Sequence, residues 1–167
     1  MMRPLLLGLF ACPALVGCAA YIPRAVSPGM AAAEVSAHAG KPVAEGRFAS
    51  NEPYWDYTDQ PFGYTNYRVT FGPDDRVRDV RNLLTEQNLA NIGPRMTQEE
   101  VAAIVGPSAR KRSYWNGTTS WTYRYLDGQL VKLLNVIFDR EGHVLSRYTE
   151  WDPAVYSGGD AGRGQGR

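Results

Sequence analysis

Cysteine is almost absent from this chain, and its two copies lie near the N-terminus, at positions 12 and 18. The residues after Cys18 therefore contain no thiol for a disulfide, a metal site or a catalytic nucleophile. Histidine is equally rare. His38 lies on an expected helix and His143 at an expected hairpin, and neither has a cysteine or an acidic cluster at metal-ligand spacing. We expect both histidines to be surface or partly packed residues, and we expect no metal and no cofactor.

An excess of charge of one sign is also missing, since 18 Lys and Arg stand against 17 Asp and Glu. This balance gives no electrostatic reason to expect nucleic acid as a partner. The motifs of serine hydrolases, zinc proteases and phosphate-binding loops do not occur. The acidic pairs Asp74-Asp75 and Glu99-Glu100 lie in an expected turn and at an expected helix start. The sequence therefore predicts a protein that is not an enzyme and takes no small-molecule substrate.

The long apolar run of a spanning helix is lacking as well. The apolar stretch from Leu5 to Val16 is too short for one, follows Arg3 and leads into Gly17-Cys18. This pattern is typical of a bacterial lipoprotein signal, in which the cysteine thiol takes a diacylglyceryl group before cleavage. Residues 1–17 are therefore expected to be the signal peptide, and Cys18 the lipid attachment site. Ordinary secretory cleavage after Ala20 is the alternative.

Lipidation would anchor the chain without spanning the membrane, because several acyl chains on one residue suffice for stable attachment. Ala19 stands where an aspartate would, by the familiar sorting convention, favour the inner membrane. We therefore expect the periplasmic face of the outer membrane, with residues 18–27 as a tether. Residues 157–167 are rich in glycine and hold no apolar residue larger than alanine, so they are expected to be a disordered tail.

The remaining sequence contains an internal repeat. Pro28-Gly29-Met30 aligns with Pro94-Arg95-Met96, and later residues keep nearly the same offset. The further matches are Glu34-Val35 with Glu100-Val101, Gly40 with Gly106, Trp55-Asp56-Tyr57 with Trp121-Thr122-Tyr123, and, one residue later, Val69, Phe71 and Val77 with Val136, Phe138 and Val144. The sequence thus predicts an α+β fold of two tandem units, residues 28–83 and 84–156. Each unit would be a short helical opening packed on a small antiparallel β-meander.

Turn and cap signals place the elements of each unit. Thr97 and Glu100 form a capping box that starts a helix, and Gly106 ends it. In the first unit Ser27-Pro28 offers a cap and a proline for the equivalent helix, residues 31–39 favour helix, and Gly40 ends it. A shorter helix is expected over residues 85–92. Strands are expected over 110–114, 120–126, 130–138 and 143–150, separated by turn residues.

The motifs of the second unit resemble the SmpA/OmlA (BamE-like) lipoprotein domain. They are Leu84-Thr85 to Ile92, Arg95 to Val101, Gly106-Pro107, Trp121-x-Tyr123 and Val136-x-Phe138-Asp139-x-x-Gly142. The first unit is similar more loosely, and two such units in tandem resemble the β-lactamase inhibitor protein family. The resemblance covers residues 28 to 152. It implies two short helices on a small sheet, and a relation to an accessory lipoprotein of outer-membrane β-barrel assembly.

Aromatic residues alternate along the expected strands, so each set points to one face of its sheet. One interpretation is that this face packs against the protein's own helices. The other is an open aromatic surface, since Trp and Tyr anchor protein interfaces. The residues are Trp55, Tyr57, Trp121, Tyr123 and Tyr125.

The third strands of the two units differ on one face. In the first unit this face is polar and is expected to be solvated, with Asn66, Arg68 and Thr70. In the second unit it is apolar apart from Asn135, with Val131, Leu133 and Ile137. A strand that is apolar on both faces needs cover on both. The cover is either the first unit or another protein, which makes these three residues candidates for partner binding.

Two functional hypotheses follow. The first is a non-catalytic, lipid-anchored interaction or scaffolding module that binds envelope proteins, such as the β-barrel assembly machinery. The second is an inhibitor-like module that clamps a periplasmic or secreted enzyme.

Overall fold

The computed structural model describes residues 26–156. The predicted signal peptide, the lipid site Cys18 and the Gly-rich tail lie outside this part of the chain. The predicted tether is wrong at its end, because Val26 is buried in the core of the first sheet. Over residues 26–156, no helix is long and apolar enough to cross a membrane.

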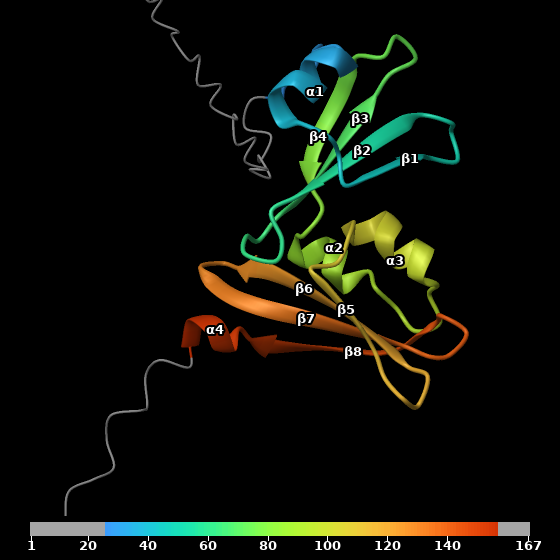
Figure 1. Ribbon diagram of the computed structural model, residues 1–167, viewed down its shortest axis with the longest axis vertical. Coiled ribbons are helices and arrows are strands. Elements are labelled where there is room, and N and C mark those ends of the chain that lie inside the picture. Colours follow the sequence, from blue (N-terminus) through green and yellow to red (C-terminus); the bar gives the residue numbers. More distant parts are fainter. Residues whose placement is uncertain (1–25, 157–167) are drawn as a thin grey trace, which may run out of the picture.

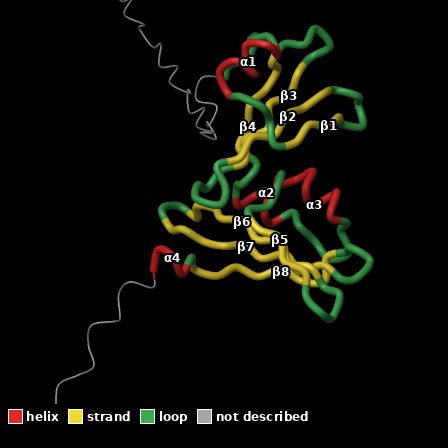
Figure 2. Tube along the Cα trace, in the orientation of Figure 1, coloured by secondary structure: helices red, strands yellow, loops and turns green. Residues whose placement is uncertain are grey.

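Residues 26–156 form two four-stranded antiparallel sheets with four short helices, a mixed α+β architecture (Figures 1 and 2). The strands are joined in sequence order within each sheet, β1-β2-β3-β4 and β5-β6-β7-β8. The elements are α1 (Ala32–Ala39), β1 (Ala44–Arg47), β2 (Pro53–Thr58), β3 (Asn66–Phe71), β4 (Val77–Asn82), α2 (Glu86–Ala90), α3 (Gln98–Val105), β5 (Arg110–Ser113), β6 (Thr119–Asp127), β7 (Leu130–Phe138), β8 (Val144–Trp151) and α4 (Pro153–Tyr156).

Helix α1 covers one face of the first sheet. Its buried residues Val35 and Ala39 pack with Tyr57, Val69 and Phe71 of the strands. Glycine ends the helix at position 40, where φ is 74°, a backbone conformation that costs an L side chain strain. A small apolar core therefore forms between α1 and one face of β2 and β3.

The start of α1 differs from the prediction. The helix begins at Ala32, not at Ser27-Pro28, and the Glu34 carboxylate accepts a hydrogen bond from the Ala31 N–H at 2.7 Å. The Gly29 N–H donates instead to the Val77 carbonyl at 2.7 Å. This segment forms a turn, in which the Met30 N–H donates to the Ser27 carbonyl at 3.3 Å, and is tied to the start of β4 rather than to a helix.

Helices α2 and α3 cover one face of the second sheet. Val101 and Val105 of α3 and Leu89 of α2 share a core with Leu134 and Val136 of β7. The capping box of α3 is confirmed, since the Glu100 N–H donates to the Thr97 hydroxyl at 3.1 Å and the Thr97 N–H donates to Glu100 at 2.8 Å. The strands of this sheet lie within one residue of the predicted ranges at each end.

Helix α3 lies between the two sheets (Figure 1). Its apolar side packs on the second sheet, and its C-terminal carbonyls accept hydrogen bonds from side chains of β3 in the first sheet. The first sheet therefore has a helix on each of its faces.

Candidate interaction surface

The aromatic strands are core elements. Trp121, Tyr123 and Tyr125 are buried against α2 and α3, and Tyr57 is buried against α1. Trp55 is partly buried and packs edge-to-face on Phe71, with the ring centroids 4.6 Å apart. The interpretation that this face packs on the protein's own helices is confirmed, and the open aromatic surface is wrong, because the helices cover the face to which these rings point.

Two of these tyrosines place their hydroxyls under a helix end. The Tyr57 hydroxyl donates to the Gly40 carbonyl at 3.3 Å, and the Tyr123 hydroxyl donates to the Gly106 carbonyl at 3.4 Å. Burial, together with the nearby charge of Glu45, raises the pKa of Tyr57 to about 12. Burial likewise raises the pKa of Tyr123 above its ordinary value. Both phenols are neutral structural donors at ordinary pH.

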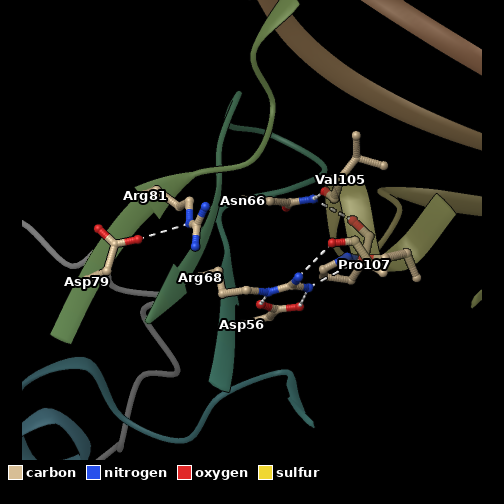
Figure 3. A network of polar contacts seen from close by, with 9 residues as sticks. Asp56, Asn66, Arg68, Asp79, Arg81, Val105 and Pro107 are labelled. Carbon is tan, nitrogen blue, oxygen red and sulfur yellow. Dashed lines mark hydrogen bonds and ion pairs between the residues drawn. The ribbon is translucent and has the colours of Figure 1, made fainter. Parts of the chain in front are cut away.

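The polar face of β3 is buried, which corrects the expectation that it is solvated (Figure 3). Arg68 makes two 2.7 Å hydrogen bonds to the carboxylate of Asp56, directly opposite on β2, and both side chains are 4% exposed. The guanidinium also donates to the Ala103 carbonyl of α3 at 2.6 Å. The physical reason is that α3 covers this face and presents carbonyls that need donors.

Asn66, two residues before Arg68 on the same face of β3, also bonds to α3. Its side-chain N–H groups donate to the carbonyls of Val105 at 2.7 Å and Pro107 at 2.8 Å, at the end of α3 (Figure 3). Gly106, between them, has φ of 76°, and a Cβ there would stand 3.2 Å from the Asn66 amide nitrogen. Asn66 and Arg68 thus bind the C-terminal end of α3, where unpaired carbonyls and the helix dipole favour donors and positive charge.

The face of the second sheet that points away from α2 and α3 is here called the outer face. It carries the three apolar residues predicted for β7: Val131 is buried, whereas Leu133 and Ile137 are half-buried. Val131 lies beside the C-terminal turn, where its N–H donates to the Tyr156 hydroxyl at 3.0 Å and its carbonyl accepts from the Asp152 N–H at 3.2 Å. The backbone of Val131 is thus bonded to the residues that lead into and end α4.

Asn135 is the polar member of the outer face on β7. Its carbonyl oxygen accepts from the Thr122 hydroxyl at 2.8 Å, and its amide donates to Glu150 at 2.7 Å. These bonds cross the three strands β6, β7 and β8. They satisfy a side chain that is only 5% exposed, so Asn135 stabilises the sheet and offers little to a partner.

A loop of the first half of the chain reaches one end of this outer face. Gln60 exchanges two hydrogen bonds with the backbone of Arg124 on β6, at 2.5 and 3.1 Å. The Arg124 guanidinium donates to the Phe62 carbonyl, pairs with Asp152 and lies over the Tyr64 ring at 4.7 Å. Arg124 therefore ties the loop between β2 and β3 to the second sheet.

This loop and the sheet enclose a groove of about 440 Å³. Partly buried Leu133 lines it, and Phe62, also in the lining, has 86% of its surface exposed. Its lining residues come from both halves of the chain: Pro61, Phe62, Ala109, Arg110, Thr122, Arg124, Leu133, Asp152, Pro153 and Ala154. Of the residues predicted to bind a partner, only Leu133 lines this groove. The others of the groove were missed, because none of them carries a local signal for binding.

Histidine and acidic residues do not gather into a site. His143 lies 3.8 Å from Asp139, four residues earlier, at the turn between β7 and β8. Within residues 26–156, no group of three or more His, Cys, Asp or Glu side chains is placed to hold a metal ion.

Comparison with known proteins adds no identification. No protein-family model matches this chain, and no curated protein matches it significantly.

Proposed function

We propose that this chain is a lipid-anchored lipoprotein of the outer membrane that binds envelope proteins through the outer face of its second sheet. It does so as a non-catalytic interaction or scaffolding module. Its partners are envelope proteins, such as the β-barrel assembly machinery. The membrane anchor is the lipid on Cys18.

The observation that carries this proposal is the unequal cover of the four sheet faces. Helices α1 and α3 cover the two faces of the first sheet, and α2 and α3 cover one face of the second. The outer face is contacted by the Gln60–Phe62 loop and by the residues around α4, and no such helix pair packs on it within residues 26–156. Leu133 and Ile137 are only partly buried there, and Tyr148 of β8 is 51% exposed. Exposed apolar side chains on a sheet face suit a protein partner.

Equivalent local geometry supports the tandem arrangement that the internal sequence repeat predicts. Gly40 and Gly106 have φ of 74° and 76°, and each accepts a hydrogen bond from a tyrosine hydroxyl of the next sheet. Each sheet also has an irregularity in the pairing of its last two strands, and each helix start bridges the turn between those strands. The bridges are Ala31 with Arg76 and Thr97 with His143.

The anchor is tested by metabolic labelling with a fatty-acid probe. We expect the wild-type protein to take up the label and to fractionate with the outer membrane. Cys18→Ala should abolish the label, whereas Cys12→Ala, the matched change inside the predicted signal, should keep it. A wild-type protein that is unlabelled and free of membranes would rule out the anchor.

The partner is tested by chemical cross-linking in envelope membranes followed by affinity purification. Recovery of β-barrel assembly subunits, reduced by Leu133→Asp, would support the proposal. Recovery of a single soluble enzyme would favour the inhibitor-like alternative, and recovery of no envelope protein would refute both.

A further inference from the structure

We propose that the groove on the outer face binds a protein segment that carries an aromatic or large aliphatic side chain next to a carboxylate. This inference rests on the proposed interaction function and names the site and the chemistry of its partner. The occupant is a segment of another protein.

Apolar side chains of the lining supply the apolar part of the site. They include Leu133, which is half-buried, with Pro61 and Ala109. Phe62 exposes 86% of its surface at the edge, although its backbone is fixed by the hydrogen bond from Arg124. A phenyl ring held in water at the edge of an apolar groove gains contact area when an apolar side chain enters.

The charged residues of the groove favour a negatively charged partner. Arg110 and Arg124 line it with a single acid, Asp152, which pairs with Arg124. The side chain of Arg110 is exposed and forms no ion pair within residues 26–156. The lining therefore carries one uncompensated positive charge. A guanidinium in this position can accept a carboxylate in a two-bond arrangement.

The size of the groove limits what can enter. Its volume of about 440 Å³ lies in the range of pockets that enclose small ligands, so it holds one or two side chains rather than a whole helix. A short anchor of this kind, surrounded by a wider contact, is how most interfaces concentrate their affinity. Leu133 and Phe62 would contact the apolar side chain, and Arg110 its acidic neighbour.

The probe for this site is the peptide acetyl-Ser-Phe-Glu-Leu-Ser-amide, titrated into the purified ¹⁵N-labelled protein and followed by NMR. We expect shifts at the amides of Ala109, Thr122 and Leu133. The same peptide with Gln in place of Glu should bind about two- to fivefold more weakly, because an ion pair with an exposed arginine contributes only modestly. A peptide with Ala in place of Phe and Leu should not bind. Shifts elsewhere alone, or equal binding of all three peptides, would overturn the assignment.

Matched variants separate the groove from the rest of the surface. Phe62→Ala should weaken binding about fivefold or more, as expected for an anchor residue. Trp115→Ala, at a hairpin tip and 98% exposed, should change nothing. Arg110→Gln should remove the preference for Glu over Gln, whereas Arg112→Gln, on the same strand but outside the groove, should keep it. Equal effects within either pair would refute the site.

The two levels of the proposal can fail separately. If envelope partners are recovered in cells but Phe62→Ala does not reduce the recovery, the groove is wrong and the interaction function stands. If the peptide binds as described but no envelope protein is recovered, the groove is right and the proposed function is wrong.

Discussion

The buried pair of Arg68 and Asp56 provides the sharpest test of how the two sheets are held together. In Arg68→Met the Asp56 carboxylate keeps its buried place but loses both 2.7 Å hydrogen bonds and its counterion. The Ala103 carbonyl loses a 2.6 Å bond, and the Tyr54 ring loses the guanidinium that lies 4.0 Å from its centroid. The change thus leaves a buried charge without compensation.

The magnitude follows from this environment. Breaking a buried pair by removing one partner costs about 3–5 kcal/mol. For a domain of this size that corresponds to a fall of roughly 10–20 °C in Tm. Thermal melts and urea denaturation measure both quantities. The double variant Asp56→Leu/Arg68→Met should recover much of the loss, because an apolar pair can replace a buried ion pair at little cost.

Arg81→Met is the matched control, since Arg81 lies opposite Arg68 on β4 and pairs with Asp79 at 3.0 Å on the surface (Figure 3). Arg81→Met should lower the free energy of unfolding by no more than about 1 kcal/mol. The reasoning fails if Arg68→Met and Arg81→Met lower the free energy of unfolding equally. It also fails if the double variant Asp56→Leu/Arg68→Met loses as much free energy of unfolding as Asp56→Leu and Arg68→Met lose in sum.

Three further predictions concern positions elsewhere in the fold. Leu133→Asp should lower the free energy of unfolding by about 1 kcal/mol or less, because this side chain is only partly buried. Leu134→Asp, at the neighbouring position but 1% exposed, should lower it by several kcal/mol, and thermal melts compare the two variants. Arg95 has φ of 67°, so Arg95→Gly should raise the free energy of unfolding by about 1 kcal/mol in urea denaturation. The pKa of Tyr57 is raised from 10 to about 12 in the folded state. The neutral phenol therefore contributes fully to the stability of the fold below pH 10, and this contribution disappears as the pH rises through 12. Tyr57→Phe should therefore reduce the loss of stability between pH 10 and 12, by about 2–3 kcal/mol, and an unchanged alkaline profile would contradict this.

The elements with local signals were predictable from the sequence. The capping box at Thr97 and Glu100, the glycine that ends α3 and the strands of the second sheet depend on residues close together in the chain. Alternation along a strand also predicted which side chains share a face, but it left open whether helices cover that face. Trp121 and Tyr123 are buried because α2 and α3 pack on their face, a tertiary contact that the strand pattern alone does not specify.

The junction between the sheets was not predictable in this way. Asn66 and Arg68 have the pattern of a solvated strand face, and only the position of α3 makes them buried donors. One signal was available: Asp56 and Arg68 are opposite residues in the antiparallel pair of β2 and β3, which suits an ion pair. The groove had no such signal, because Phe62 and Arg110 come from separate halves of the chain and meet only through the folded loop.

Site-specific photo-cross-linking in living cells tests the central claim most directly. A benzoylphenylalanine placed at Phe62 should form an adduct with an envelope protein, and Leu133→Asp in the same chain should abolish it. The same photoreactive residue at Trp115 should not form that adduct. If position 62 forms no protein adduct, or forms one that Leu133→Asp leaves unchanged, the outer face is not the binding surface and the account is contradicted.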